Sequence, residues 1–209
     1  MFERFLAAFS VLPAGQVPGE VWRDDRLLVC PGYPELASRF AGCSFENGLY
    51  RIHDAVTGPK AVALTAESFP QFASRGCPFG YDWLGRQFAV DSGRLEGREP
   101  LVLLFEPGTG EVLEIPFSFT RFHGQLDELR EPALAGSFFA GWAQANPDLL
   151  PLDAEQCVGY KVPLFLGGKD VVENLEVTDL EVYWSLSGQL RKGTQTLPPG
   201  SAIGQVKRA

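Results

Sequence analysis

The chain has 209 residues, 45% of them hydrophobic and 12% aromatic, which is enough apolar material for a sizeable core and excludes a disordered chain. The formal net charge of −8 and a pI near 4.8 argue against binding to nucleic acid, which depends on Lys and Arg at the phosphates. The same charge suits a basic protein partner. No apolar run is long enough to span a membrane.

The first segment, MFERFLAAFSVLPAG, predicts an amphipathic helix. Phe2, Phe5, Leu6 and Phe9 have the spacing of one helical face. The alternative, the core of a signal peptide, lacks a net positive start and a clear A-x-A cleavage site. We therefore expect a packed helix here.

The following region predicts one helix and then mainly strands. Pro34 and Gly42 have the positions of a helix start and a helix end, and residues 47–53 predict a strand. Residues 77–117 predict antiparallel sheet, in which the continuous apolar run 100–105 is a central strand. The segment EPGTGE that follows this run is the turn of a hairpin.

Helices dominate the pattern from residue 118 onward. Ser118 can cap a first helix, and residues 132–145 predict a second, with Phe138, Phe139 and Trp142 on its apolar face.

The C-terminal part predicts two strands and a last helix. Residues 158–166 and 174–177 have strand-like patterns, separated by a turn at Gly167 and Gly168. Thr178 and Glu181 have the spacing of a capping box that starts the last helix.

This order of elements predicts an α+β fold with a mixed, largely antiparallel sheet and helices packed on it. We expect an N-terminal region over residues 1–125 and a C-terminal domain over residues 126–209, which can also form one compact unit.

The residue types that carry chemistry are sparse. Four cysteines without a C-x-x-C pair and two histidines do not make a zinc site of ordinary spacing, and we expect reduced thiols in a cytoplasmic protein. The segment GGKD at 167–170 lacks the first glycine and the Ser or Thr of a phosphate loop. We therefore predict no metal, no cofactor and no catalytic residues. Acid–base chemistry by His53 or His123 is the enzyme alternative.

Negative charge is concentrated in one part of the chain. Between residues 125 and 184 there are eleven acids and three bases, whereas the remainder is balanced. This segment is either a solvated acidic face or a docking surface for a cationic protein. The candidate partner-binding residues are the acids Asp127, Glu128, Asp170, Glu173, Glu176, Asp179 and Glu181, together with Trp83, which we expect to be partly exposed in GYDWLGRQ.

Three motifs resemble a known family. They are FGYDWLGRQFAVD (79–91), LVLLFEPGTGEVLEIPFSFTRFH (101–123) and CVGYKVPLFLGGKDVVENLEVTDLEVYWSLSGQL (157–190). Together they resemble bacterial immunity proteins of type VI secretion DNase effectors, in which a GAD-like N-terminal region precedes a C-terminal immunity domain. The order of the blocks is also distantly similar to SUKH (SMI1/KNR4-like) immunity proteins. The resemblance covers residues 33–206.

The resemblance implies a cytoplasmic protein that binds a cognate toxin, a basic nuclease, by direct protein–protein contact and neutralises it. It implies no catalytic residues and binding to neither nucleic acid nor membrane. The alternative is an SMI1/KNR4-like scaffold or regulatory adaptor without a toxin partner.

Overall fold

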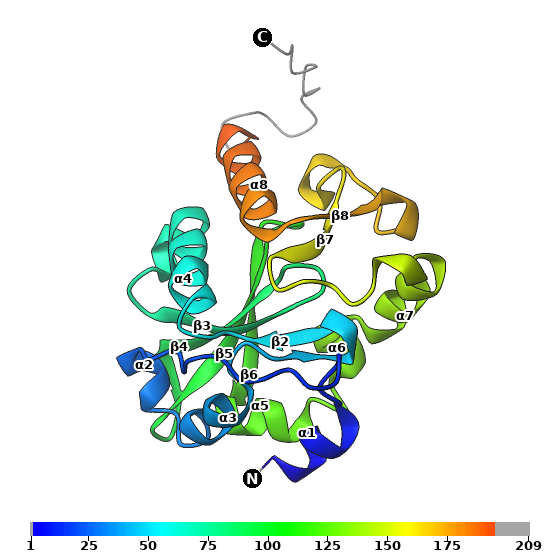
Figure 1. Ribbon diagram of the computed structural model, residues 1–209. Coiled ribbons are helices and arrows are strands. Elements are labelled where there is room, and N and C mark those ends of the chain that lie inside the picture. The colour runs from blue at the N-terminus through cyan, green and yellow to red at the C-terminus, as the bar shows by residue number, and fades with distance from the viewer. Residues whose placement is uncertain (1, 195–209) are drawn as a thin grey trace.

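The structure is a computed structural model that describes residues 2–194. The last part of the predicted C-terminal domain, residues 195–209, lies outside this range. Its centre is a six-stranded antiparallel sheet in which strands adjacent in the chain are adjacent in space (Figure 1). The strands are β1 Ser44–Phe45, β2 Tyr50–Ile52, β3 Gly76–Asp82, β4 Gln87–Glu96, β5 Glu99–Glu106 and β6 Glu111–Ser118.

Helices precede, interrupt and follow this sheet. They are α1 Glu3–Ala8, α2 Asp25–Leu28, α3 Tyr33–Phe40, α4 Thr57–Ser68, α5 Phe119–Gln125, α6 Arg130–Leu134, α7 Gly136–Ala145 and α8 Leu180–Thr194. A separate two-stranded antiparallel sheet pairs β7 Gln156–Tyr160 with β8 Leu175–Asp179. The predicted α+β class is confirmed.

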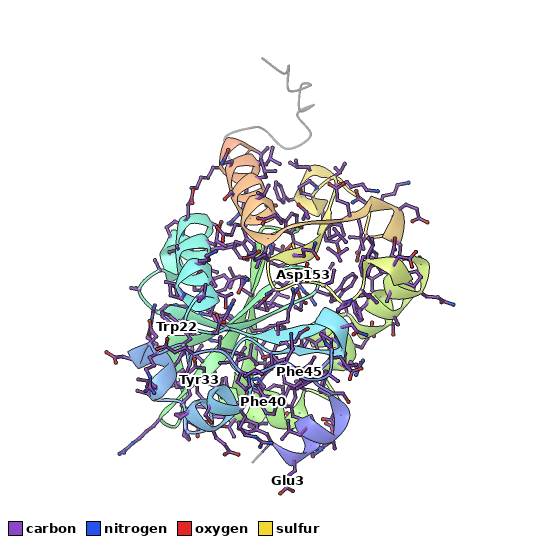
Figure 2. The ribbon with its side chains drawn as sticks, viewed as in Figure 1. Glu3, Trp22, Tyr33, Phe40, Phe45 and Asp153 are labelled. Atoms are coloured by element: carbon purple, nitrogen blue, oxygen red, sulfur yellow. The ribbon has the colours of Figure 1, made fainter. Side chains whose placement is uncertain are left out.

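Helices cover both faces of the six-stranded sheet. Alternate strand residues such as Phe79 and Phe88 pack with α1, α3 and α5, as Tyr33 and Phe45 show on that side in Figure 2. The intervening residues, such as Leu103, pack with α8 and α4 on the opposite face (Figure 1). Because both faces are buried, β5 reads as a continuous apolar run instead of an alternating one.

A buried arginine connects the C-terminal segment to the sheet. Arg51 of β2 is 2% exposed, and its Nη1 donates to the backbone carbonyls of Asp153 at 2.7 Å and Gln156 at 2.8 Å. Its Nη2 donates to the carbonyl of Asp82 at 3.1 Å, and its guanidinium lies 4.3 Å from the centre of the Tyr81 ring. Asp153 lies between the large sheet and the C-terminal hairpin (Figure 2).

Two further bonds connect the same parts of the chain. The Val158 amide of β7 donates to the Trp83 carbonyl at 2.7 Å, and the Trp184 indole of α8 donates to the Gly85 carbonyl at 2.7 Å. The turn that follows β3 thus accepts bonds from both β7 and α8. These contacts fix β7 and α8 against the central sheet.

Most predicted elements are confirmed, including the helices at the start of the chain, the sheet over 77–117, the hairpin turn at 106–111 and the last helix. The single helix predicted over 132–145 is wrong: Ala135 has φ of +50°, in the left-handed region, so α6 and α7 are separate. The strand predicted over 158–166 ends at Tyr160, ahead of Pro163, whose missing N–H cannot continue a ladder.

The expected caps differ in detail. The Asp179 carboxylate, not the Thr178 hydroxyl, accepts from a first-turn amide of α8, that of Val182, at 2.9 Å. Ser118 precedes α5 but makes no side-chain cap bond. Helix α4 was not predicted; the Asp54 carboxylate accepts from the amides of Val56 and Thr57 at its start.

Replacing Arg51 with Met removes three hydrogen bonds to backbone carbonyls, that of Asp82 being buried and the other two partly buried, while retaining most of the apolar stem. We expect Arg51→Met to lower the free energy of unfolding by about 2–4 kcal/mol, measured by urea denaturation. Arg98→Met, at an exposed position in the turn between β4 and β5, is the matched control. Equal unfolding midpoints for the two variants would contradict the connecting role of Arg51.

Candidate functional site

Five exposed carboxylates lie on the C-terminal hairpin and the start of α8. This C-terminal acidic surface consists of Asp170, Glu173, Glu176, Asp179 and Glu181. They come from the loop between β7 and β8, from β8 itself and from the first turn of α8, which lie together in the upper part of the molecule (Figure 1). The fold therefore places the elements that carry these acids in one part of the molecule (Figure 1).

The loop between β7 and β8 is held by one asparagine. The Asn174 side chain accepts from the Val162 amide at 3.0 Å and donates to the carbonyls of Val162 and Lys169, both at 2.9 Å. Gly167 has φ of +86°, which favours glycine at the predicted turn. Leu164 donates its amide to the Gly108 carbonyl at 2.9 Å, which anchors the loop to the hairpin turn of the large sheet.

Three of the five carboxylates have partners within the fold. Asp170 accepts from the Tyr160 hydroxyl at 2.7 Å, and burial together with this carboxylate raises the pKa of Tyr160. Asp179 caps α8, and Glu181 pairs with Lys60 of α4 at 2.6 Å.

The other two carboxylates are available for a partner. Within residues 2–194, neither Glu173 nor Glu176 uses its side chain in a hydrogen bond or an ion pair, and both are exposed. These two side chains can therefore meet a cation without losing an internal contact.

A groove of about 110 Å³ lies between the β7–β8 hairpin and α8. Tyr160 and Tyr183 line it, Glu176 and Lys161 contribute charges, and Leu186 lies on its α8 side with 54% of its surface exposed. An apolar wall beside polar groups is typical of the centre and rim of a protein interface.

Leu186 was not among the residues predicted from the sequence. The sequence pattern that indicates this exposed site is the pair Val182 and Leu186, which have i, i+4 spacing on α8. Both are exposed, whereas Tyr183 and Trp184 of the same helix are buried. Val182 is 50% exposed, so this second apolar stripe faces outward.

The two remaining acids belong to a different region. Asp127 and Glu128 pair with Arg4 of α1 at 2.9 and 2.6 Å. Helix α1 lies at the opposite end of the molecule from α8 (Figure 1). The structure therefore does not bring Asp127 and Glu128 together with the C-terminal acidic surface.

The expected exposure of Trp83 is wrong. Trp83 is 0% exposed, its indole donates to the Leu134 carbonyl at 2.9 Å, and its ring packs against Phe138 and Phe139. The neighbouring glycines permit close packing here, because a Cβ at Gly85 would contact Cys157 at 3.0 Å. Trp83 is an anchor of the core and offers no surface to a partner.

Both histidines are buried and separate from the acidic surface. His53 contacts Thr57 and Gln87, and His123 contacts the Tyr50 hydroxyl at 2.9 Å and the Phe119 carbonyl at 2.9 Å. Desolvation lowers the pKa of each to about 4, so both are neutral at pH 7.

The described part of the chain has no convergent set of metal ligands and no membrane-spanning helix. All four cysteines are buried, free thiols. Over residues 2–194, no three His, Cys, Asp or Glu side chains converge as metal ligands would, and none of the helices has the length and apolarity needed to cross a membrane.

The C-terminal segment matches the model of a known protein family. A family model described as "T6SS immunity protein Tdi1, C-terminal" matches residues 137–191, from α7 through the hairpin into α8. This confirms the resemblance to type VI secretion immunity proteins. The matched segment contains the whole C-terminal acidic surface and the groove beside it.

A solved structure has the same fold. The crystal structure of Atu4351 from Agrobacterium tumefaciens is similar with a TM-score of 0.62 and 17% identity, over 90% of this chain and 89% of that one. At this identity the likeness shows the fold alone. A comparison with curated proteins finds no match.

Asn174→Ala removes three hydrogen bonds from the loop between β7 and β8. We expect a loss of about 1–3 kcal/mol of local stability, seen as faster amide exchange over residues 162–170. Asn174→Asp keeps the acceptor but loses both donations, so its exchange should be intermediate. Unchanged exchange in Asn174→Ala would contradict the holding role of this side chain.

The burial of the two histidines predicts that the free energy of unfolding decreases at acidic pH. Their pKa of about 4 in the fold lies below the ordinary value of 6.5, so the unfolded chain binds protons first as the pH falls. Their contribution to stability is complete above pH 6.5 and is lost between pH 6.5 and pH 4. We expect about 2 kcal/mol of loss per histidine between pH 7 and pH 5, measured by urea denaturation. A flat profile over this window would contradict the burial of neutral histidines.

Proposed function

We propose that this protein binds and neutralises a cognate antibacterial toxin delivered by a type VI secretion system. The observation that carries the proposal is a coincidence of position: the segment that matches the immunity family also bears the C-terminal acidic surface and the groove. Neutralisation would occur by direct contact in the cytoplasm. The N-terminal sheet would serve as the scaffold that holds the hairpin and α8 in place.

We propose a DNase as the toxin class. A DNA-cleaving enzyme carries Lys and Arg side chains that bind phosphates. Glu173 and Glu176, exposed and without side-chain partners among residues 2–194, can occupy such positions as phosphate mimics. A net charge of −8 would also accelerate encounter with a basic protein.

The proposed inhibition needs no chemistry from this protein. The immunity family points to a non-catalytic role. The two histidines lie inside the core at distances from Tyr50 and Gln87 that suit ordinary structural hydrogen bonds. Covering the toxin's active site, or distorting it, would be sufficient.

The test begins with capture of tagged protein from its native cell lysate and identification of stoichiometric partners. The captured partner is then expressed alone and with this protein in a laboratory host. The proposal expects a partner that degrades DNA and kills the host alone, with survival on co-expression. A harmless partner would favour the alternative, a scaffold or adaptor role.

Charge reversal tests the binding surface. We expect Glu173→Lys/Glu176→Lys to slow association with the toxin at least tenfold at low salt, because complementary charge steers encounter. Surface plasmon resonance measures the rate. The matched control is Asp127→Lys/Glu128→Lys, which changes charge equally at the opposite end and should leave the rate within about twofold. Equal rates for both variants would contradict binding through the C-terminal acidic surface.

A further inference from the structure

The two-stranded sheet of β7 and β8 has one edge that the fold covers. At the outer edge of β7, the Gln156 carbonyl accepts from Arg51 at 2.8 Å, and the Val158 amide donates to the Trp83 carbonyl at 2.7 Å. The backbone of β7 is therefore bonded on both sides, to β8 and to the central part of the molecule.

The opposite edge of this sheet, along β8, is open among residues 2–194. The Lys161 amide donates to the Asn174 carbonyl and the Leu180 amide to the Glu155 carbonyl, both at 2.8 Å. Because bonded and non-bonded pairs alternate in an antiparallel ladder, the intervening Val177 directs its N–H and C=O away from β7. Neither backbone group of Val177 has a hydrogen bond to a described residue.

The two edges of the six-stranded sheet are protected in ways that β8 is not. The Ser44 carbonyl of β1 accepts from the Leu12 amide at 3.1 Å, and the Ser44 amide donates to the Gln16 side chain at 2.7 Å. Strand β6 contains Pro116, which has no N–H to offer a neighbouring strand. Covering segments and prolines are common protections of edge strands. β8 contains no proline, and no strand of residues 2–194 pairs with its outer edge.

The side chains of β8 indicate which kind of strand fits this edge. Glu176 and Thr178 line the groove beside α8, and Glu176 is exposed, whereas Val177 is half-buried and packs against the core. Opposite charges at neighbouring positions of paired strands stabilise a sheet, and like charges destabilise it. A second copy of this chain would bring one acidic segment against another. A strand that carries Lys or Arg would instead complement Glu176.

We propose that an extended strand of the toxin pairs with the outer edge of β8 and places a Lys or Arg side chain beside Glu176. This inference rests on the proposed function and specifies how the toxin is held. The toxin strand exchanges both backbone hydrogen bonds with Val177 and donates to the Leu175 carbonyl, which points the same way. The backbone bonds supply affinity, and the basic side chain selects the register of the added strand.

A proline at position 177 tests the pairing. Val177→Pro removes the outward N–H and leaves the ladder bonds to β7 in place, since proline is tolerated where the N–H of an edge strand faces outward. We expect the dissociation constant for the captured, DNA-degrading toxin to rise at least about tenfold, because a backbone hydrogen bond is lost. Isothermal titration calorimetry with the full chain measures this constant.

The matched control is Val177→Ala, which shortens the side chain and keeps the N–H. Its dissociation constant should lie within about twofold of that of the unmodified protein, as is usual for a change that leaves the bonded groups in place. Equal losses of affinity in the two variants would assign the effect to the side chain and overturn the proposal.

Amide exchange in the unmodified protein, resolved by residue with NMR, provides a test that needs no variant. In the free protein we expect the Val177 amide to exchange at least about tenfold faster than the amides of Glu176 and Thr178, which bond to β7. In the complex the Val177 amide should exchange as slowly as its neighbours. Fast exchange of Val177 in the complex would overturn the proposal. Slow exchange in the free protein would also overturn it, because the edge would then be covered by a second copy or by residues 195–209.

The results also separate this inference from the proposed function. Survival of the host on co-expression, together with fast exchange of the Val177 amide in the complex, would leave the immunity role in place and remove strand pairing. A captured partner that is harmless to the host would overturn both, because no toxin strand would then exist to pair with β8.

Discussion

The buried guanidinium of Arg51 is the contact on which the position of the C-terminal segment depends. A cation 2% exposed to solvent needs acceptors within the fold, and here two strands and a loop supply them for Nη1 and Nη2, whereas Nε has no partner among residues 2–194. Its bonds to Asp153 and Gln156 fix the chain at the start of β7. The hairpin and α8 follow this point in the chain, so Arg51 of β2 helps to fix the position of the elements that carry the acidic surface.

This arrangement explains how a rigid core and a charged surface coexist in one segment. The inward side of β7 and α8 is held by Val158 and Trp184, which bond to the turn after β3. Glu173, Glu176 and the apolar stripe of α8 lie on the outward side. A surface fixed in this way loses little conformational freedom on binding, which favours affinity for a partner of complementary charge.

The sequence predicted those elements whose pattern is local. The apolar run of β5, the turn EPGTGE and the amphipathic face of α8 each carry their own signal, and each is present in the structure. Helix α4 was missed because its first turn contains Gly58 and Pro59, and Asp54 caps it from outside the periodic stretch.

The candidate site was only partly predictable, because its contacts join distant residues. Glu181 pairs with Lys60, 121 positions away, and Asp127 pairs with Arg4, 123 positions away. No local pattern separates these paired acids from Glu173 and Glu176. Trp83 was misjudged for a similar reason: glycines beside an aromatic residue indicate exposure in a loop, but in this fold Gly85 makes room for Cys157 and Leu180.

The central claim is that the partner binds the C-terminal hairpin and the start of α8. Hydrogen–deuterium exchange of the protein with and without its captured toxin tests this most directly. The account predicts slower exchange on complex formation over residues 161–181, with residues 119–131, near the control acids, unchanged. Protection confined to 119–131, or to the edge strand β6, with none over 161–181, would contradict it.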